Sequence, residues 1–512
     1  MLRNILSNWV GLVVAGAISF LITPVLVHGL GNFYFGIWVL VSSIVDYYGF
    51  LDLGMRTAVV RFVARSKGGN ERQGLNQTLT SGLAITMVIA IVILGSSALV
   101  AAVLPRFVDV SRVPRPIFRW LVGFLGASIA VAFPARMLSS YLSGLQRYDL
   151  LNLATISTTL MRAVCFVIIL RCGYGIIGVA VVTCAAWVIS LTLQWILIRR
   201  ADPEVVVHWS ETSWRRIREL FSFGVYAFLN TVGDYLRFYV DSIVIARVLD
   251  VALITPFDIV AKLMEYMKSV VISCGSPLMS EMCALDGGNR DGEIERIFLR
   301  SIRAFTLLSG FMGFMLVLNG RELLRVWVGQ SFTAYYNLLV LLSLAYIVLL
   351  SQHPSILLII AKGRHQAMGW WSVAEGVINL SLSIYWGRRY GLFGVALGTV
   401  VPLVALRVSI QPWYTLRILS LSVRRYIAEG VGRPLLACAA FLIVCVPIVH
   451  LTHPENVLHL IATSAWQTVL FAVLALTLGM NRADREYVFQ RGRQVANSVI
   501  RMRETVSLSR AA

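Results

Sequence analysis

The stretch Trp9-Val-Gly-Leu-Val-Val-Ala-Gly-Ala-Ile-Ser-Phe-Leu-Ile-Thr-Pro-Val-Leu-Val27 contains no charged residue. At about 1.5 Å per residue, a helix of this length comes close to spanning the ~30 Å hydrocarbon core of a bilayer. The small residues Ala15-Gly-Ala17 resemble a signal-peptidase site, but the apolar run continues beyond them. We therefore interpret the stretch as an uncleaved first membrane span.

Apolar runs of similar length recur along the whole chain of 512 residues, of which 58% are apolar and only 14% charged. A soluble protein could not bury this much apolar surface, whereas lipid solvates the outside of membrane helices. We predict an all-α integral membrane protein with about 14 transmembrane helices. They are expected near residues 9–28, 34–54, 78–104, 117–135, 150–170, 174–198, 221–249, 252–279, 301–319, 334–360, 366–387, 391–416, 434–450 and 457–479.

The charge of the loops predicts the orientation. If the N-terminus is cytoplasmic, the inner segments carry about 29 Lys and Arg and the outer loops about 10. An even number of spans then places both termini in the cytoplasm. We attribute the net charge of +19 to this asymmetry and to contact with anionic membrane lipids, and we expect no nucleic-acid partner.

An internal repeat predicts the domain organisation. The sequence Tyr174-Gly-Ile-Ile-Gly-Val-Ala-Val-Val-Thr183 returns as Tyr390-Gly-Leu-Phe-Gly-Val-Ala-Leu-Gly-Thr399, each time at the start of the span that closes a block of six. Two copies with the same orientation are typical of alternating-access transporters. We predict two pseudo-symmetric six-helix lobes at 1–200 and 201–420, the second with an interfacial helix near 212–221. Two additional transmembrane helices at 421–480 and a basic cytoplasmic tail at 481–512 complete the chain.

The sequence lacks the motifs of several enzyme classes. It contains no Walker A motif and no HExxH, and its seven Cys lie in or beside apolar runs without forming a CxxC. The predicted loops are shorter than is usual for a membrane glycosyltransferase or polymerase. We therefore expect no enzyme activity, no catalytic residues, no metal site and no bound cofactor.

The order of several short elements carries a family resemblance. Asn8-Trp-Val-Gly11, Thr23-Pro24, Tyr34-Phe-Gly-Ile-Trp38 and Leu51-Asp-Leu-Gly54 followed by Arg61 resemble the start of bacterial Wzx-like polysaccharide (O-antigen) flippases. These belong to the multidrug/oligosaccharidyl-lipid/polysaccharide (MOP) exporter superfamily. Residues 213–250 are similar to the start of the family's second lobe, and the resemblance covers roughly residues 1–420.

The resemblance implies a fold and a function. The fold is the MATE-like V-shaped pair of six-helix bundles. The function is translocation of polyprenyl-pyrophosphate-linked oligosaccharide from the cytoplasmic to the periplasmic face of the bacterial inner membrane, for O-antigen or exopolysaccharide biosynthesis. Transport would proceed by alternating access through a cationic central cavity, with the polymerase and chain-length proteins of the pathway as further partners. Two alternatives stay open: a cation-coupled drug antiporter of the same superfamily, and a membrane-embedded polysaccharide polymerase or transferase.

Arginines inside the spans are the first candidates for the cargo site, because charge at membrane depth is costly and usually functional. Arg162 and Arg407 lie deep in predicted spans, and Arg136 follows Pro134, where a broken helix could expose backbone groups to a cavity. A pyrophosphate needs charge-assisted donors, and Arg supplies a bidentate fork. We predict that these three bind the pyrophosphate, with Arg237 and Lys262 contributing from the second lobe. The alternative is structural pairing with acids of other helices, such as Asp46, Asp234 or Glu375.

Two acids inside spans, Asp46 and Glu375, are candidates for ion coupling. Burial disfavours a charged carboxylate, which could then hold a coupling H⁺ or Na⁺. An ion pair or a helix-packing hydrogen bond is the alternative for each of them.

Overall fold

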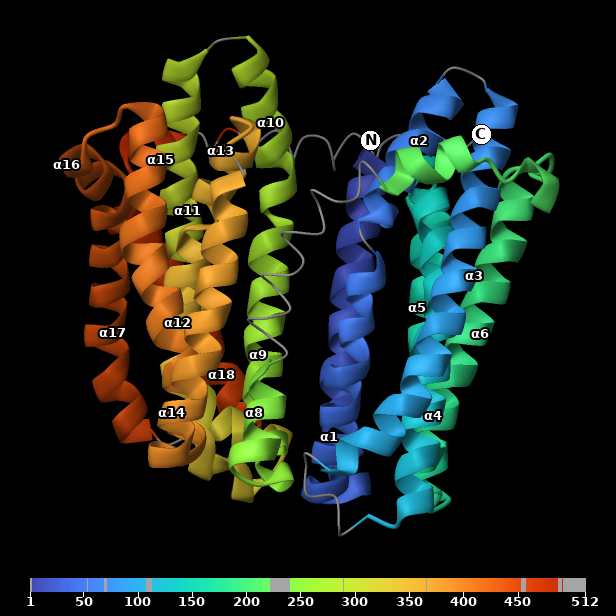
Figure 1. Ribbon diagram of the computed structural model, residues 1–512. Helices are drawn as coiled ribbons and strands as arrows, with labels where there is room; N and C mark the ends of the chain where they lie inside the picture. The colour runs from blue at the N-terminus through green and yellow to red at the C-terminus, as the bar shows by residue number, and fades with distance from the viewer. Residues whose placement is uncertain are drawn as a thin grey trace, which may run out of the picture. The chain divides into compact units, whose positions relative to one another are not determined.

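The computed structural model describes residues 2–52, 54–68, 71–106, 113–221, 240–288, 290–364, 366–452, 457–486 and 490. All secondary structure in these ranges is helical (Figure 1). The predicted all-α class is confirmed. The first part of the chain forms α1 (Leu2–Asp46), η1 (Tyr47–Asp52), α2 (Met55–Gly68), α3 (Arg72–Val103), η2 (Leu104–Arg106), α4 (Arg115–Gly144), α5 (Tyr148–Arg171), α6 (Gly175–Ala201) and η3 (Trp209–Glu211).

The rest of the described chain is also helical, with short π-helical turns at three places. Its elements are α8 (Val240–Val248), η4 (Val251–Leu253), α9 (Ile254–Ser273), α10 (Gly275–Gly287), α11 (Asp291–Trp327), η5 (Gln330–Tyr335), α12 (Tyr336–Ser351), α13 (His353–Ala361), α14 (Gln366–Ala405), η6 (Leu406–Ile410), α15 (Gln411–Leu419), α16 (Val423–Arg425), η7 (Tyr426–Gly432), α17 (Arg433–Thr452), α18 (Val457–Leu474) and η8 (Ala475–Gly479).

Within the described residues, ten helical segments are long and apolar enough to cross a membrane. Two of them, Val13–Asp52 and Met368–Leu419, each contain two of the predicted spans. A glycine with positive φ separates the two spans in both cases, Gly31 in α1 (φ 77°) and Gly391 in α14 (φ 61°). The ten segments thus account for twelve predicted spans. Of the remaining two, 221–249 lies largely outside the described residues, and 252–279 contains α9 and the start of α10.

The two copies of the internal repeat adopt the same local backbone. Gly175 and Gly391 both have positive φ, 56° and 61°, a conformation that glycine adopts without steric cost. A Cβ at Gly178 would lie 2.3 Å from Ile169 Cγ2, and one at Gly394 would lie 2.0 Å from the Trp386 carbonyl oxygen. In each copy, therefore, one glycine makes the turn and the next lets the new helix pack closely on the preceding one.

Contacts between Cα atoms divide the chain into two compact units. The first unit comprises residues 1–260 and 366–402, and the second comprises 261–365 and 403–512. In the first unit α1 packs against η4 and the start of α9, where the Thr255 hydroxyl donates to the Asn32 carbonyl oxygen at 2.5 Å. Gly36 makes this approach possible, because a Cβ there would lie 2.3 Å from the Val251 carbonyl oxygen.

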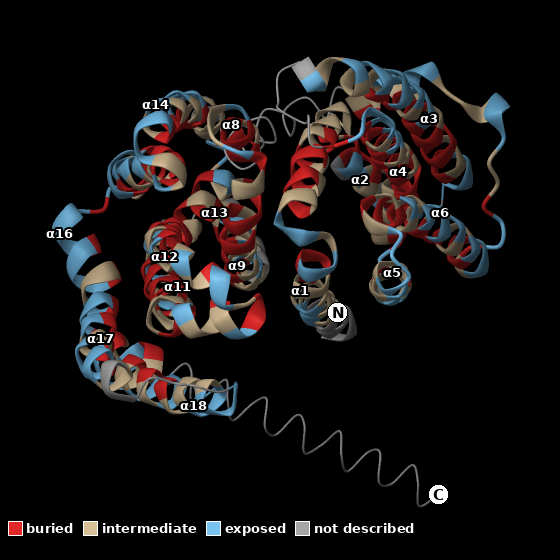
Figure 2. Ribbon diagram, turned by 90° about the horizontal axis from the view of Figure 1, so that it is seen from below, coloured by how far each residue is buried: buried red, intermediate tan, exposed pale blue. Residues whose placement is uncertain are grey.

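Helix α4 is the central helix of the first unit. It packs against α1, α2, α3, α5 and α6, and more than half of its residues are buried (Figure 2). Pro134 lies within this helix, which continues as far as Gly144. The expected break at Pro134 is therefore wrong: the helix absorbs the proline, and Arg136 projects from a continuous helix.

The second unit is built around α11, which packs against α12, α13, α17 and α18. Side chains on α11 also hold the C-terminal segments by polar contacts. The Arg303 Nε donates to Asp484 Oδ2 at 2.6 Å, and the Asn319 amide donates to Gln467 Oε1 at 2.7 Å. The two additional helices α17 and α18 share an apolar cluster with α11 that includes the buried Cys438 and Cys445. All seven cysteines are free.

Residues 214–221 form the helix expected at the membrane interface. Trp214 is 78% exposed, whereas Leu220 is fully buried. The Arg216 guanidinium carbon lies 5.0 Å from the centre of the Phe62 ring, a cation–π contact with α2. The basic tail expected at 481–512 lies mostly outside the described residues.

Candidate functional site

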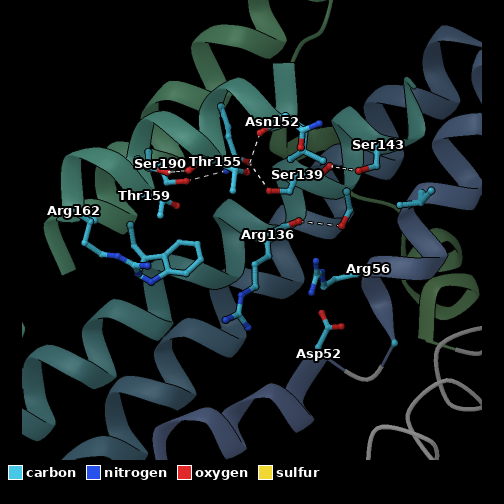
Figure 3. Close-up of a pocket in the computed structure, with 18 residues that line it drawn as sticks. Asp52, Arg56, Arg136, Ser139, Ser143, Asn152, Thr155, Thr159, Arg162 and Ser190 are labelled. Carbon is cyan, nitrogen blue, oxygen red and sulfur yellow. Dashed lines mark hydrogen bonds between the residues drawn. The ribbon is translucent and has the colours of Figure 1, made fainter. Parts of the chain in front are cut away.

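The first unit contains a pocket of about 730 Å³ lined by side chains of η1, α2, α4, α5 and α6 (Figure 3). This volume falls in the range of sites that bury most of a small-molecule ligand, roughly 300–1,000 Å³. The predicted residues Arg136 and Arg162 both line it. The structure thus brings together two of the three arginines predicted to bind the cargo.

Helix α5 reaches the pocket with one polar face. Asn152, Thr155, Thr159 and Arg162 follow one another at spacings of three, four and three residues, which places them in one stripe along the helix. The opposite face is apolar and exposed, as expected for contact with lipid, and carries Leu153, Leu160, Val164 and Ile168. Because the two faces differ so sharply, the orientation of α5 follows from its sequence.

Helix α4 supplies the next wall. It carries Arg136, Ser139, Ser140 and Ser143, which again lie on one side of a helix. Their hydroxyl groups donate to backbone carbonyls one turn earlier, for example Ser143 to Ser139 O at 2.9 Å. For Ser140 and Ser143 these bonds satisfy the hydroxyl protons within the helix and leave oxygen lone pairs as acceptors towards the pocket, whereas the Ser139 hydroxyl lies within reach of both the Ala135 carbonyl and Gln194 Oε1.

Helix α6 closes the pocket with Trp187, Ser190 and Gln194. The Ser139 hydroxyl donates to Gln194 Oε1 at 2.8 Å, and Gln194 Nε2 donates to Ser190 at 3.0 Å. The Gln194 side chain is buried, and its hydrogen bonds to Ser139 and Ser190 fix its orientation. The pocket wall between α4 and α6 is thus rigid and polar.

Among the described residues of the lining the net charge is positive, with Arg56, Arg136 and Arg162 against the single carboxylate of Asp52. The Arg136 guanidinium carbon lies 5.5 Å from the centre of the Trp187 ring and within electrostatic range of Asp46 and Asp52. Figure 3 shows Arg56, Asp52 and Arg136 gathered at one side of the pocket. Arg136 is therefore oriented by an aromatic ring and partly balanced by nearby acids.

Arg162 has a different environment. It is partly buried, and within the described residues no acidic side chain acts on its guanidinium. It lies apart from the group formed by Arg56, Asp52 and Arg136 (Figure 3). A desolvated guanidinium without an acidic partner favours an incoming anion.

The other predicted residues lie elsewhere. Arg407 belongs to the second unit, on the π-helical turn η6, where it is buried and donates to Gln411. Gln411 in turn donates to the Gln352 carbonyl oxygen at 2.8 Å, and Arg407 acts electrostatically on His353. This buried polar network is consistent with a structural role as well as with a functional one, so the role of Arg407 stays a prediction.

The remaining candidates also do not line this pocket. Lys262 lies on α9, partly buried, and Arg237 lies outside the described residues. Asp46 ends α1 within range of Arg136, and Glu375 is buried in the first half of α14. Their predicted roles likewise stay predictions.

Several pocket residues were not among the predicted ones. They are neutral and hydrophilic, and include Ser139, Asn152, Thr155, Thr159 and Gln194. A sequence analysis that looks for charged residues inside membrane spans does not select them, because neutral polar side chains are tolerated in membrane helices. Their three- and four-residue spacing opposite an apolar face on α5 is the sequence pattern that could have identified them.

Residues 1–283 match the family described as polysaccharide biosynthesis protein. The chain belongs to this family. It is 21% identical to the uncharacterized membrane protein EpsK of Bacillus subtilis (strain 168), over 97% of this chain and 99% of that protein. It is 19% identical to a candidate O-antigen transporter of Shigella flexneri, over 81% of this chain and 98% of that one. The family expected from the sequence is confirmed.

Solved structures show the same fold. An inward-facing multidrug-resistance MATE family transporter of the MOP superfamily has a TM-score of 0.67 at 14% identity, covering 79% of this chain and 94% of that one. A MOP superfamily transporter from Pyrococcus furiosus has a TM-score of 0.59 at 15% identity, covering 82% and 96%. The MATE-like fold predicted from the resemblance is thereby confirmed.

Proposed function

We propose that this chain is a flippase that moves polyprenyl-pyrophosphate-linked oligosaccharide from the cytoplasmic to the periplasmic face of the inner membrane. The observation that carries the proposal is the pocket of the first unit, which combines three arginines with a wall of hydroxyl and amide groups. The membership of the polysaccharide biosynthesis family supports it, as does the name of the Shigella flexneri relative.

The chemistry of the pocket fits both parts of such a head group. A pyrophosphate carries negative charge, and Arg136 and Arg162 offer guanidinium forks that match phosphate oxygens. Sugars present many hydroxyl groups, which Asn152, Thr159 and Gln194 can meet as donors or acceptors. Moving this head group through bare hydrocarbon would mean desolvating every one of these groups, at several kcal/mol each. A polar pocket replaces the lost hydration.

The positive net charge of the pocket also weighs against the alternative function, antiport of cationic drugs. Positive side chains outnumber negative ones there, so a cationic drug would be repelled and an anionic head group attracted. The inward face of α4, α5 and α6 carries hydroxyl and guanidinium groups rather than a mainly apolar and aromatic lining. Of the lining residues that the structure describes, Trp187 is the one with an aromatic side chain.

In this proposal the two lobes alternate access to the cargo, both termini are cytoplasmic, and H⁺ or Na⁺ is the coupling ion. The product of flipping is then consumed by the polymerase and chain-length proteins of surface polysaccharide assembly. Arg407, Arg237 and Lys262 contribute positive charge from the second lobe.

Reconstitution into liposomes tests the proposal. The purified full chain is inserted with a fluorescent polyprenyl-pyrophosphate oligosaccharide, and accessibility of the label to a membrane-impermeant quencher is followed with time. Transfer of the label between leaflets is the expected result. Cation-dependent drug efflux without transfer of the lipid would support the antiporter instead, and new glycosidic bonds would support a polymerase or transferase. In cells, deletion should cause the lipid-linked intermediate to accumulate on the cytoplasmic side.

A further inference from the structure

A second, smaller pocket of about 330 Å³ lies in the first unit between α2, the start of α3 and the interfacial helix 214–221. None of its lining residues belongs to the cargo pocket. Among the described residues of this lining the charges balance, with the arginines Arg215 and Arg216 against the carboxylates of Glu71 and Glu219. A pocket with charges of both signs suits a ligand that also carries both.

The surroundings of this pocket place it at the depth of lipid head groups. Its residue Gln77 lies in the second turn of α3, directly before the long apolar part of that helix. Trp214 stands between two lining residues, and Trp209 belongs to η3, which packs against α3. Both tryptophan side chains are exposed. Exposed Trp beside the end of a membrane span is typical of the membrane–water interface.

The interfacial helix forms the positive side of the pocket. Arg215 Nε lies 3.2 Å from Glu219 Oε1, and Arg216 Nη1 lies 3.0 Å from Glu219 Oε2, so two guanidinium groups share one carboxylate. Arg216 is also held by its cation–π contact with Phe62. Ion pairs that solvent reaches contribute little to stability, so a phosphate can take up the remaining guanidinium donors at small cost.

The first turn of this helix is tied to α3. The Arg216 backbone N–H donates to Ser213 Oγ at 3.4 Å, and the Ser213 N–H donates to Ser81 Oγ at 3.2 Å. The positive end of the helix dipole therefore lies at the pocket beside the two arginines, where it favours an anionic group.

The start of α3 forms the negative side. A Cβ at Gly74 would lie 2.6 Å from Ser66 Oγ and 3.3 Å from Glu71 Oε2, so both oxygen atoms gather at this glycine. Glu71 is exposed and forms no ion pair with another described residue. A carboxylate and a hydroxyl oxygen are both acceptors for an ammonium group, which has three N–H donors.

We propose that this pocket binds the head group of phosphatidylethanolamine, with its phosphate at Arg215 and Arg216 and its primary ammonium at Glu71 and Ser66. Phosphatidylcholine has no N–H to donate to Glu71, and phosphatidylglycerol has no positive charge to balance it. The bound lipid would join the interfacial helix to α2 and α3. The inference does not rest on the proposed cargo, because the pyrophosphate of the cargo has no ammonium group for Glu71.

Native mass spectrometry of the purified full chain in detergent tests the site. The chain is titrated with dioleoyl phosphatidylethanolamine, phosphatidylcholine and phosphatidylglycerol, and the lipid bound per chain is measured. Hydrogen bonds to a charged group should make one phosphatidylethanolamine bind about 10- to 150-fold more tightly than phosphatidylcholine. A phosphatidylethanolamine with a diazirine in its acyl chain should cross-link to peptides that contain residues 62–77 or 213–221.

Two variants separate the two sides of the pocket. Glu71→Gln should remove the preference for phosphatidylethanolamine over phosphatidylcholine and strengthen binding of phosphatidylglycerol. Arg216→Gln should weaken phosphatidylethanolamine and phosphatidylcholine alike, and Arg216→Lys should restore part of the binding, because an ammonium keeps the charge without the bidentate fork. A purely structural role of these residues would not reverse a preference between lipids. Size-exclusion chromatography confirms that each variant is folded.

The chain offers matched controls outside the lining. Arg218 is exposed on the same interfacial helix, and Glu204 is an exposed acid that pairs with Arg72 at 2.9 Å. Arg218→Gln and Glu204→Gln should keep the wild-type preference, and loss of it in either would overturn the assignment.

Three further outcomes would overturn it. The first is equal binding of the three phospholipids by the wild type. The second is an unchanged preference for phosphatidylethanolamine in Glu71→Gln. The third is displacement of phosphatidylethanolamine from the cross-linked site by polyprenyl pyrophosphate, which would make this pocket part of the cargo path. Since no lipid-linked sugar enters the binding assay, its failure leaves the flippase proposal intact, and a failed flipping assay leaves this site intact.

Discussion

Replacing Arg162 by Gln is the sharpest test of the cargo pocket. The side chain is partly buried, lines the pocket at the end of the polar stripe of α5, and has no acidic partner among the described residues. Hydrogen bonds to a charged group contribute about 1.5–3 kcal/mol, so losing those of one guanidinium to a phosphate should weaken cargo binding about 10- to 150-fold. At limiting cargo concentration the flipping rate should fall by the same factor.

The structure also predicts that this variant folds. Removing one member of a buried ion pair leaves an uncompensated charge behind, but the described residues place no carboxylate against Arg162. The thermal unfolding midpoint of Arg162→Gln should therefore equal or exceed that of the wild type. Arg162→Lys should restore flipping only in part, because an ammonium keeps the charge and loses the bidentate fork.

Arg171→Gln is the matched control. Arg171 lies in the last turn of the same helix, exposed and outside the pocket. The Arg171→Gln variant should transfer the lipid-linked oligosaccharide between leaflets at the wild-type rate in the same liposome assay. Normal flipping by Arg162→Gln would refute the cargo role of this residue. Failure of Arg162→Gln to accumulate in the membrane would instead favour a structural ion pair.

Further predictions concern stability and are measured by thermal unfolding of the purified chain. Asp484→Asn leaves the buried Arg303 without its carboxylate partner, although its bond to the Glu429 carbonyl remains, and should cost about 3–5 kcal/mol. Asp291→Asn removes one exposed partner of Lys362 and should cost at most about 1 kcal/mol; equal effects would contradict the burial argument. Gly391→Ala forces a side chain into left-handed backbone and should destabilise by about 1–2 kcal/mol, so an unchanged midpoint would show that the turn relaxes. Gln467→Leu removes an interhelical bond between α18 and α11 and should cost about 0.6–1.7 kcal/mol; a gain in stability would mean that the bond costs more than it contributes.

Most of the fold could be predicted from the sequence because a bilayer imposes simple length and polarity rules. A run such as Trp9 to Val27 has few alternatives to a membrane helix. The repeat was equally informative, since Gly175 and Gly391 are needed for the backbone that both copies adopt. The helix break considered at Pro134 does not occur. A proline within a membrane helix breaks the helix only when neighbouring helices do not accommodate it, and α4 packs against five other helices.

The candidate site was predictable only in part. Arg136 and Arg162 were found because charge in a span is conspicuous. The hydroxyl stripe of α5 has a sequence signature, its spacing opposite an apolar face, but its place in one pocket with Gln194 depends on α4, α5 and α6 facing one another. For the same reason the contact of Asp241 with Thr399, 158 positions away in the sequence, could not be predicted from either helix alone.

The two copies of the repeat share a backbone and differ in where they carry polar groups. Residues of the second copy lie 216 positions after those of the first, as Tyr174 and Tyr390 show. Arg162 of the first copy lines the cargo pocket, and the second copy has the exposed Ile378 at the corresponding position. Asn379 of the second copy is buried, and the first copy has Ala163 at the corresponding position. One hairpin is thus polar on the face that lines the pocket, and the other on the face that packs against Asp241. Other polar positions occur in both copies, Thr183 with Thr399 and Thr159 with Glu375, so the copies differ at particular positions rather than throughout.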